Sequence, residues 1–550
     1  MDTDVIHSVL NQVPALQGYN TFESDRVLVE GLEREGGGWA RGRARDLGAI
    51  AGGDAVAWGF DANRYPPVLR THDRLGHRVD EVDFHPAWHA LMRTAVEHQL
   101  HALPWREPRP GAHVARSAMY FAFTQAEQGH GCPITMTFAV IPALRTQPDL
   151  AAAWEPLLTA DVYDPRPVAL SQKRGALAGM AMTERQGGSD VRANTTCAEP
   201  AGTRTGPGAE YVLTGHKWFC SAPMSDGFLT LAQAPRGLTC FLVPRLLPDA
   251  SRNRILVQRL KDKLGNRSNA SSEIEYHGAH AWMVGPEGRG VATIIQMVAH
   301  TRFDCVMGSA ALMRQAVVQA IHHATSRAAF GRPLVEQPLM RNVLADLSLE
   351  SEAATTLMLR LARAYDEARH DPHQASFARV ATAVAKFWVC KRAITHVAES
   401  LECLGGGGYV EESVLPRLYR EAPVNSAWEG SGNVICLDVL RALGRDPGGQ
   451  EALTAEIGLG RGVDRHLDAY LRALEERLAH GPDGNAETEA RRLVAHMAVA
   501  LQASLLVRHA PAAVADAFIA SRIVAPGHTV GALPAAADLG AVIERNRPVC

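Results

Sequence analysis

The 550-residue sequence lacks the features that direct a protein into or across a membrane. Its first residues are acidic where a secretory signal needs basic ones, and no apolar core follows them. The longest weakly polar run, residues 493–507, is bounded by arginines and is shorter than the roughly 18 apolar residues of a membrane-spanning helix. We therefore expect a cytoplasmic protein with no membrane span.

Cysteine is also sparse, because the nine cysteines are never closer than 13 positions. The chain has no Cys-x-x-Cys pair of the kind that binds zinc or forms a redox disulfide. We expect no metal site and mostly buried, reduced thiols. Neither sign of charge dominates, since the formal net charge is −3 at pH 7, so binding of nucleic acid would need a local basic patch.

What the sequence does contain is typical of a globular protein, with 46% hydrophobic and 21% charged residues and a mean hydropathy of −0.10. At roughly 150 residues per domain, the length predicts about three or four domains. Residues 1–180 show helical segments separated by Pro and Gly, and residues 181–285 show short β-rich runs. Residues 286–445 return to helical periodicity, and residues 446–550 are rich in Ala, Leu and Arg. The predicted fold class is mainly α with a central β domain.

Three features of the sequence support this division into helical and β-rich regions. The β domain is predicted from runs that begin at Tyr211, Gly227, Leu238 and Ser272, each bounded by turn residues. Near the start of the chain, Pro86 follows a capping position and predicts a helix. One long helix is predicted from the apolar stripe formed by Val343, Leu344, Leu347, Ala354, Leu357, Leu361 and Tyr365.

Two segments of the β domain are candidate ligand sites. Residues 182–190, Met-Thr-Glu-Arg-Gln-Gly-Gly-Ser-Asp, combine hydroxyls with exposed backbone N–H groups, which can bind a phosphate or a polar heterocycle. A Gly-Gly turn capped by Ser and Asp is the alternative. Residues 215–221 place an aromatic pair beside a hydroxyl, which could present a flat face to a ring system, although aromatic strand residues are more often core.

Four consecutive glycines, Gly405 to Gly408, would let the backbone approach a ligand closely. The segment does not fit G-x-G-x-x-G, because Val410 occupies the last glycine position, and no Lys-Ser/Thr follows for a P-loop. The pattern disfavours a nicotinamide or ATP site.

One carboxylate, Glu429, lies between Trp428 and a Gly-Ser-Gly turn. Held against apolar surface, a glutamate can gain the basicity that proton abstraction next to a carbonyl requires. A glutamate that caps a helix would have the same pattern, so this motif alone leaves both interpretations open.

In their order along the chain, these motifs resemble the acyl-CoA dehydrogenase flavoprotein family over about residues 80–445. The resemblance implies a helical N-terminal domain, a β-barrel, a C-terminal four-helix bundle and, in this chain, an extra helical domain. It also implies FAD as cofactor and an acyl-CoA or related small molecule as substrate. No electron acceptor follows from it.

The resemblance further implies roles for individual residues. Residues 182–190 resemble the first family signature, and residues 215–221 resemble the strand beside the isoalloxazine, with Phe219 where many relatives have Trp. Arg327 to Gly331 resemble a segment that reaches the FAD of a neighbouring subunit, and Glu429 corresponds to the base that removes the α-proton. The residues assigned to FAD are Met182, Thr183, Gly188, Ser189, Phe219, Cys220, Ser221, Arg327, Phe330, Gln337, Gly405, Gly406, Asn425, Trp428, Gly430, Ser431 and Asn433. Arg302 and Trp428 are assigned to the substrate pocket, and Glu402 stands where relatives have Gln.

At finer grain, the chain resembles the alkylation-response branch of this family. The segments that carry this resemblance are 34–39, 84–89, 132–138, 261–270 and 301–304, with the C-terminal extension. That branch has a site similar to that of isovaleryl-CoA dehydrogenases, forms tetramers and binds double-stranded DNA through its C-terminal domain.

The predicted DNA contact is a small set of arginines. Residues 446–550 hold ten Arg, no Lys and thirteen Asp or Glu, a net charge of −3. DNA binding would have to come from Arg461, Arg465 and Arg472, which share helical spacing, and a solvated helix face is an equally good interpretation.

The resemblance thus implies an FAD-dependent dehydrogenase in which Glu429 removes a proton α to a thioester carbonyl while flavin N5 accepts a hydride from the β carbon. The alternative is a DNA-binding stress-protection protein whose flavin site is structural or acts slowly on a substrate other than a CoA ester.

Overall fold

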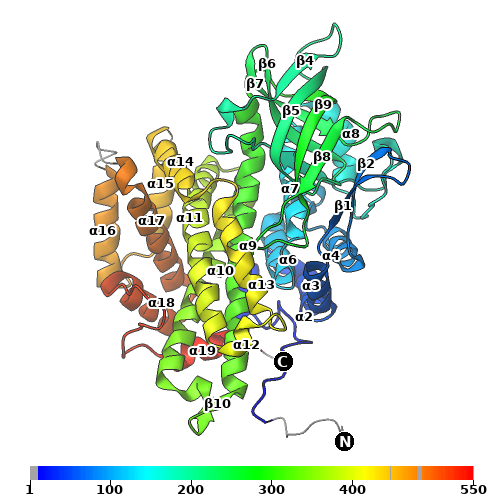
Figure 1. The fold of residues 1–550 in the computed structure, drawn as a ribbon. Helices are drawn as coiled ribbons and strands as arrows, with labels where there is room; N and C mark the ends of the chain where they lie inside the picture. The colour runs from blue at the N-terminus through cyan, green and yellow to red at the C-terminus, as the bar shows by residue number, and fades with distance from the viewer. Residues whose placement is uncertain (1–9, 446, 480–485, 549–550) are drawn as a thin grey trace, which may run out of the picture. The chain divides into compact units, whose positions relative to one another are not determined.

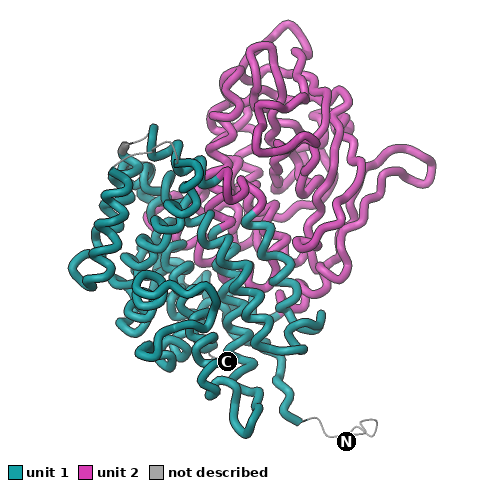
Figure 2. Tube along the Cα trace, turned by 60° about the vertical axis from the view of Figure 1, so that its left-hand side comes forward, with its two compact units in different colours: residues 1–53, 306–426, 435–550 teal, residues 54–305, 427–434 magenta. Residues whose placement is uncertain are grey.

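The computed structural model describes residues 10–445, 447–479 and 486–548 (Figure 1). The chain divides into two compact units, each assembled from separate segments (Figure 2). Unit 1 contains residues 1–53, 306–426 and 435–550, and unit 2 contains residues 54–305 and 427–434. This differs from the four predicted domains, because the first 53 residues join the helical bundle and the short segment around Glu429 joins the barrel.

Unit 2 begins with helices and one hairpin. Its elements up to residue 158 are α3 (Asp54–Arg64), β1 (Val68–His72), β2 (Arg78–Asp83), α4 (Pro86–Glu97), α5 (Leu103–Arg106), α6 (Ala112–Thr124), α7 (Gly131–Leu144) and α8 (Pro148–Leu158). The predicted start of α4 is confirmed, since His85 Nδ1 accepts a hydrogen bond from the backbone N–H of Ala87. The prediction of a helical domain over residues 1–180 missed the strands β1 and β2.

The centre of unit 2 is a β-barrel. Its strands are β3 (Ala178–Ala181), β4 (Cys197–Pro200), β5 (Glu210–Ser221), β6 (Gly227–Ala234), β7 (Gly237–Pro244), β8 (Ile255–Leu260) and β9 (Ser271–Val284). The sheet order is β3-β6-β4-β5-β9-β7, β8 pairs with β9, and pairing of β6 with β7 closes the ring (Figure 1). The four predicted strand runs lie in β5, β6, β7 and β9, and the barrel begins three residues before the predicted boundary.

The strands β6 and β7 are buried on both faces. Inside the barrel, Phe228 and Phe241 pack with Tyr211. On the outer face, Leu229 and other residues of these strands pack against a cluster that includes residues of α7 and α8. This double burial explains why both strands are near-continuous apolar runs in the sequence.

Unit 1 is helical. It contains α1 (Arg26–Arg34), α2 (Arg41–Gly52), most of α9 (Gly290–Ser326), β10 (Ala328–Ala329), β11 (Arg332–Pro333), α10 (Pro338–Glu367), α11 (Pro372–Glu402), α12 (Gly406–Tyr409), α13 (Leu415–Ala427), α14 (Gly432–Arg445), α15 (Pro447–Gly458), α16 (Arg465–Ala479), α17 (Ala486–His509), α18 (Ala512–Ile519) and α19 (Leu539–Asn546). The helix predicted from the stripe of residues 343–365 is confirmed as α10. The predicted domain boundary falls on Asp446, which lies outside the described residues, and α15 begins directly after it.

Among the described helices, α17 is long and apolar enough to cross a membrane by length and composition. However, 67% of its apolar window is buried inside the protein, where α17 packs on α10, α11, α15 and α16. This burial is the property of a core helix of a folded domain.

The arginines of the extension do not form the predicted helix face. Arg461 precedes α16, so it does not share a helix with Arg465 and Arg472. It forms an ion pair with Glu475 instead. The helical spacing inferred from the sequence is therefore wrong at its first member.

Candidate functional site

A fully buried ion pair organises the first signature segment. Glu184 and Lys217 both have side chains that are 0% exposed, and their charged atoms lie 2.8 Å apart. Glu184 also accepts hydrogen bonds from the backbone N–H and hydroxyl groups of Thr195 and Thr196. Burial opposes ionisation, but these donors and the Lys217 ammonium hold the pKa of Glu184 well below its usual range. Since every oxygen is satisfied, the pair can fix residues 182–190 against β5.

Glu184 and Lys217 were named from the sequence only as parts of two motifs, and neither was assigned a role. Their pairing could have been suspected, because a Glu and a Lys each lie inside a short segment predicted to contact the same ligand. Their pairing explains why those two segments lie side by side.

The end of β5 presents alternate side chains to solvent and to the barrel core. Phe219 is 47% exposed, whereas Cys220 is 1% exposed and belongs to the core cluster. Burial raises the pKa of Cys220 to about 12. The prediction that Cys220 contacts the cofactor can therefore hold only for its backbone, since successive residues of a strand point to opposite faces.

The outward face beside Phe219 combines aromatic and polar groups. Lys261 Nζ lies 3.5 Å from the centre of the Trp218 ring and 4.6 Å from that of Phe219. The carbonyl of Thr183 accepts a hydrogen bond from the Trp218 N–H, so the first signature runs along this strand. Gly188 must be glycine, because a Cβ there would lie 2.4 Å from Thr183 Oγ1. Met182 is partly buried, and Gly188 and Ser189 are exposed.

Glu429 is held in a strained conformation by two residues of α9. Thr301 Oγ1 donates a hydrogen bond of 2.6 Å to Glu429 Oε2. Arg302 Nε donates one of 2.9 Å to the Glu429 carbonyl oxygen. The φ of Glu429 is +57°, in the left-handed region that a non-glycine residue rarely adopts. Strain of this kind persists where the surroundings fix it, and it is common at active sites.

These contacts bear on two interpretations. Arg302, which is assigned to the substrate pocket, also anchors the main chain of Glu429. Glu429 is also not a helix cap, since its carboxylate accepts from Thr301 and α14 begins at Gly432. From the sequence, Thr301 was named only as part of the segment 301–304 and had no assigned role.

A buried network fixes the part of α9 that carries these residues. Asp304 accepts two hydrogen bonds from Arg116, of 2.8 and 2.6 Å, and one of 2.7 Å from Thr135. The Arg116 guanidinium also donates to the Leu100 carbonyl and lies 3.6 Å from the centre of the Phe138 ring. The ion pair therefore ties α9 to α6 and α7.

Polar groups surround the Cys132 thiol of α7 in unit 2. Burial raises the pKa of Cys132 to about 11, so the thiol is protonated at neutral pH. Lys263, Ser221 and Asn269 oppose this rise in the pKa, and the negative charge of Glu429 adds to it.

The remaining predicted residues are distributed as follows. In unit 2, Trp428 and Gly430 are partly buried, and Ser431 and Asn433 are exposed. In unit 1, Asn425 is buried, Gln337 Nε2 donates to the Ala329 carbonyl, and Arg327 donates to the Asn11 carbonyl. Phe330 is 96% exposed at a φ of +52°.

The glycine run has the open surroundings that a ligand-binding backbone requires. No heavy atom lies within 4 Å of a Cβ built on Gly405, Gly406 or Gly407, whereas one on Gly408 would lie 2.2 Å from the Leu401 carbonyl oxygen. Within unit 1, these glycines therefore suit close approach by a phosphate or a polar ring. Within unit 2, exposed Phe219, the exposed residues 187–189 and the Ser221 hydroxyl suit a flavin ring.

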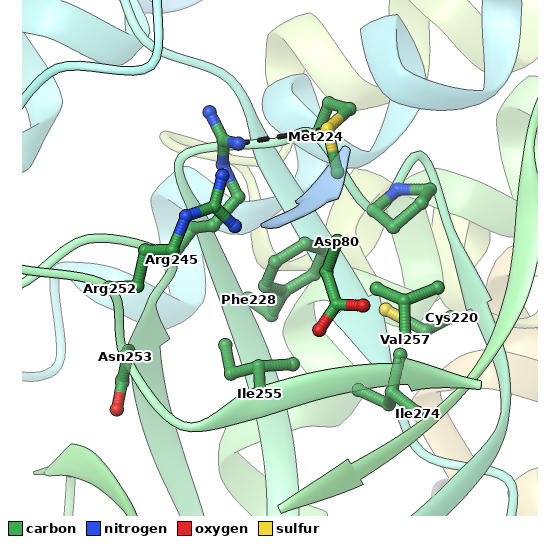
Figure 3. Close-up of a pocket in the computed structure, with 11 residues that line it drawn as sticks. Asp80, Cys220, Met224, Phe228, Arg245, Arg252, Asn253, Ile255, Val257 and Ile274 are labelled. Atoms are coloured by element: carbon green, nitrogen blue, oxygen red, sulfur yellow. Dashed lines mark hydrogen bonds between the residues drawn. The ribbon is translucent and has the colours of Figure 1, made fainter. Parts of the chain in front are cut away.

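A separate small cavity of unit 2 contains none of this chemistry (Figure 3). It has a volume of about 20 Å³, room for about one water molecule. Its lining includes Asp80, Met224, Arg245 and the inward side of Cys220. Within the described part of the chain, Asp80 Oδ1 and Arg245 Nε have no hydrogen-bond partner. The cavity suits a bridging water and is too small for a substrate.

A β-barrel flanked by helices, with a strained and anchored glutamate in the same compact unit, is the arrangement of an acyl-CoA dehydrogenase. Comparison with known proteins agrees with this. The acyl-CoA dehydrogenase middle-domain model matches residues 179–279, and the C-terminal-domain model matches residues 288–444. The chain belongs to the acyl-CoA dehydrogenase family, oxidoreductases that act on CH–CH groups and whose members bind FAD.

Within the family, the chain is of the AidB type. The model of the adaptive response protein AidB N-terminal domain matches residues 11–165. The putative acyl-CoA dehydrogenase AidB of Escherichia coli K12 is 49% identical over 475 residues, which are 86% of this chain and 87% of that protein.

Two solved structures resemble the chain over most of its length. The apo form of Bd2924 has a TM-score of 0.83 at 30% identity and covers 91% of this chain and 100% of its own. Caenorhabditis elegans ACDH-11 in complex with C11-CoA has a TM-score of 0.83 at 27% identity, covering 93% of this chain and 92% of its own.

Proposed function

We propose that this protein is an FAD-dependent dehydrogenase that removes the α and β hydrogens of an acyl-CoA, with a preference for short branched chains of the isovaleryl type. The observation that carries the proposal is the fixed carboxylate of Glu429, which has Thr301 and Arg302 as anchors and a left-handed backbone. The complex of ACDH-11 with C11-CoA supports the substrate class.

In this mechanism Glu429 takes the α-proton of the thioester. Thr301 holds one carboxylate oxygen and so fixes the orientation of the Glu429 carboxylate. Arg302 keeps the main chain in its left-handed conformation, which saves the cost of ordering the base during each turnover. When bound, FAD supplies the acceptor for the hydride from the β carbon.

Each unit by itself contains residues that the resemblance assigns to FAD. In unit 2 these are residues 182–190 with Phe219 and Ser221, whose exposed donors and aromatic face suit the isoalloxazine. In unit 1 they are residues 405–407 and the Arg327 segment.

We also propose a homotetramer located in the cytoplasm. Large apolar side chains of unit 1 are exposed in the single chain, since Phe330 is 96%, Leu339 84% and Tyr409 81% exposed. Exposure of several such side chains is typical of an association surface.

The test is anaerobic stopped-flow bleaching of the flavin by isovaleryl-CoA. Glu429→Gln keeps the shape of the site and removes the base, so we expect flavin reduction to slow at least about 10²-fold with FAD still bound. Glu412→Gln, on an exposed glutamate, serves as the matched control. Equal rates for wild type and Glu429→Gln would contradict the proposal.

We further propose that this dehydrogenase serves a response to DNA alkylation, in line with the adaptive-response model that matches its N-terminal region. A strain that lacks the gene is exposed to a methylating agent and complemented with wild type or Glu429→Gln. We expect only wild type to restore survival. Equal rescue by both would favour the alternative of a DNA-associated protein that needs no dehydrogenation.

A further inference from the structure

We propose that Lys263 is a positioning residue that, through Ser271, orients the Ser221 hydroxyl to donate a hydrogen bond toward the flavin and so favours the reduced flavin. The inference rests on the proposed FAD site. It concerns a lysine outside both family signatures.

The contacts form a chain of three polar groups. Lys263 Nζ donates to Ser271 Oγ over 2.9 Å and to the Asn269 carbonyl over 2.7 Å. Ser271 Oγ and Ser221 Oγ lie 3.3 Å apart and share a hydrogen bond. Ser221 ends β5 and Ser271 begins β9, so the chain joins the ends of two paired strands.

The loop that carries Lys263 is fixed at several points. Ser268 Oγ donates to Glu127 Oε1 over 2.7 Å, and Asn269 Nδ2 donates to Asn266 Oδ1 over 3.0 Å. Glu127 is buried, and it also accepts from the backbone N–H groups of Gly129 and His130. The ammonium is therefore held in place by the loop and not only by its own contacts.

The direction of donation follows from the donor inventory of each group. An ammonium has three donors and no acceptor, so Ser271 must accept from Lys263. Either hydroxyl could donate across the 3.3 Å between Ser271 and Ser221, and the proposed relay takes Ser271 as the donor, since Ser271 already accepts from the ammonium. The single proton of Ser221 is then left to donate outward, toward the flavin when FAD is bound.

This arrangement has an electrostatic consequence. The positive charge of Lys263 is separated from the flavin contact by two hydroxyl groups, those of Ser271 and Ser221. This charge stabilises the negative charge that develops on the flavin during reduction, and the oriented hydroxyl dipoles strengthen the effect. Removal of the charge should make the flavin harder to reduce, while merely structural damage would not shift the reduction equilibrium in a set direction.

The experiment measures the two-electron reduction equilibrium of the FAD-loaded protein by dye equilibration without acyl-CoA. For Lys263→Met we expect the reduction equilibrium constant to fall at least about tenfold, which is about 30 mV for a two-electron couple. Lys263→Arg keeps the charge and should stay within about twofold of wild type. Arg267→Met removes an exposed charge from the same loop and is the matched control.

A second pair of variants tests the relay itself. Ser271→Ala keeps Lys263 but breaks the link to Ser221, and it should lower the constant about threefold, with recovery in Ser271→Thr. An equal reduction equilibrium constant in Lys263→Met and Arg267→Met would overturn the proposal. If Lys263→Met does not fold, the comparison of Ser271→Ala with Ser271→Thr replaces it. An equal constant in those two variants would then overturn the proposal.

These outcomes are distinct from failure of the proposed function. A wild-type protein that binds no FAD would refute the cofactor assignment. A protein that binds FAD, shows the Lys263 effect and is not reduced by any acyl-CoA would refute the substrate and leave the relay standing.

Discussion

The first signature of unit 2 and the C-terminal extension of unit 1 both bury charged groups, but they use them differently. In unit 2, Glu184 and Lys217 fix a segment that is assigned to the cofactor. In the extension, Arg522 pairs with Asp346 and Glu350 of α10, and Arg545 pairs with Glu30 and Glu352. Buried ion pairs therefore hold a loop against a strand in one region and hold helices together in the other.

The comparison bears on the arginine count of the extension. Of its ten arginines, the ones that form ion pairs are Arg461, Arg477, Arg492, Arg508, Arg522, Arg545 and Arg547. A large number of arginines in a segment is therefore weak evidence for nucleic acid binding, since most of these side chains pair with carboxylates of the same chain.

The largest expected effect is at the buried pair of unit 2. Lys217→Met leaves the Glu184 carboxylate buried without its cation, which should cost about 3–5 kcal/mol of local stability. Hydrogen exchange by mass spectrometry should show faster exchange in β5 and residues 182–190, with loss of FAD. Arg461→Met, at an exposed pair, should cost less than about 1 kcal/mol. Equal effects of the two changes would remove the distinction between the regions.

A smaller effect is expected in the extension. Arg522→Met unpairs Asp346, while Glu350 keeps Arg392, so the cost should be about 3 kcal/mol, at the low end for a buried pair. Exchange should rise in α18 and α10, and FAD affinity should stay within about twofold of wild type. A loss of FAD as large as in Lys217→Met would mean that the extension supports the site directly.

Acidic pH should lower the folding stability of both units, because each contains a buried histidine. Burial lowers the pKa of His101 in unit 2 and of His396 in unit 1 to about 4 each. Because the unfolded value is near 6.5, each contributes stability that is present above about pH 6.5 and is lost as pH falls toward 4. Between pH 7 and pH 5 each should cost about 2 kcal/mol.

The check is hydrogen exchange at the two pH values. His101→Gln should reduce the pH dependence only in unit 2, and His396→Gln only in unit 1. The exposed His72→Gln is the control. An unchanged pH dependence in both variants would contradict the assignment of these histidines as buried neutral groups.

The smallest effect concerns DNA. If the extension binds duplex DNA, replacing Arg461, Arg465 and Arg472 by Gln should flatten the slope of log K against log[salt] by no more than about 1.8, since each phosphate contact is worth about 0.9 and Arg461 is paired with Glu475. Fluorescence anisotropy of a labelled duplex gives the slope. Complete loss of binding would show that these arginines are the whole DNA site.

Much of the fold could be predicted because it follows from local periodicity. The stripe of α10 and the apolar runs of β6 and β7 are strong signals at helical and strand periods. The hairpin β1–β2 was missed because its strands are rich in Arg, His and Asp and are partly exposed, so they carry no apolar alternation. The union of residues 1–53 with the bundle is a tertiary contact that no local pattern encodes.

The sequence predicted which residue is the candidate base, but not the geometry of the groups that hold it. Glu429 follows from its motif, but its left-handed backbone and the Thr301 contact depend on a helix more than 120 residues away in sequence. The same holds for Cys220, whose inward direction is set by the register of β5 with β9. Lys263 could be read only as part of a family-like segment until its contact with Ser271 was seen.

The most direct test of the central claim is exchange of the α-hydrogen of isovaleryl-CoA with deuterium from solvent, followed by NMR under anaerobic conditions. This measures removal of the α-proton separately from hydride transfer. The account predicts that Glu429→Gln exchanges at least about 10²-fold more slowly than wild type while it still binds the thioester. Equal exchange in the two proteins would contradict the assignment of Glu429 as the base.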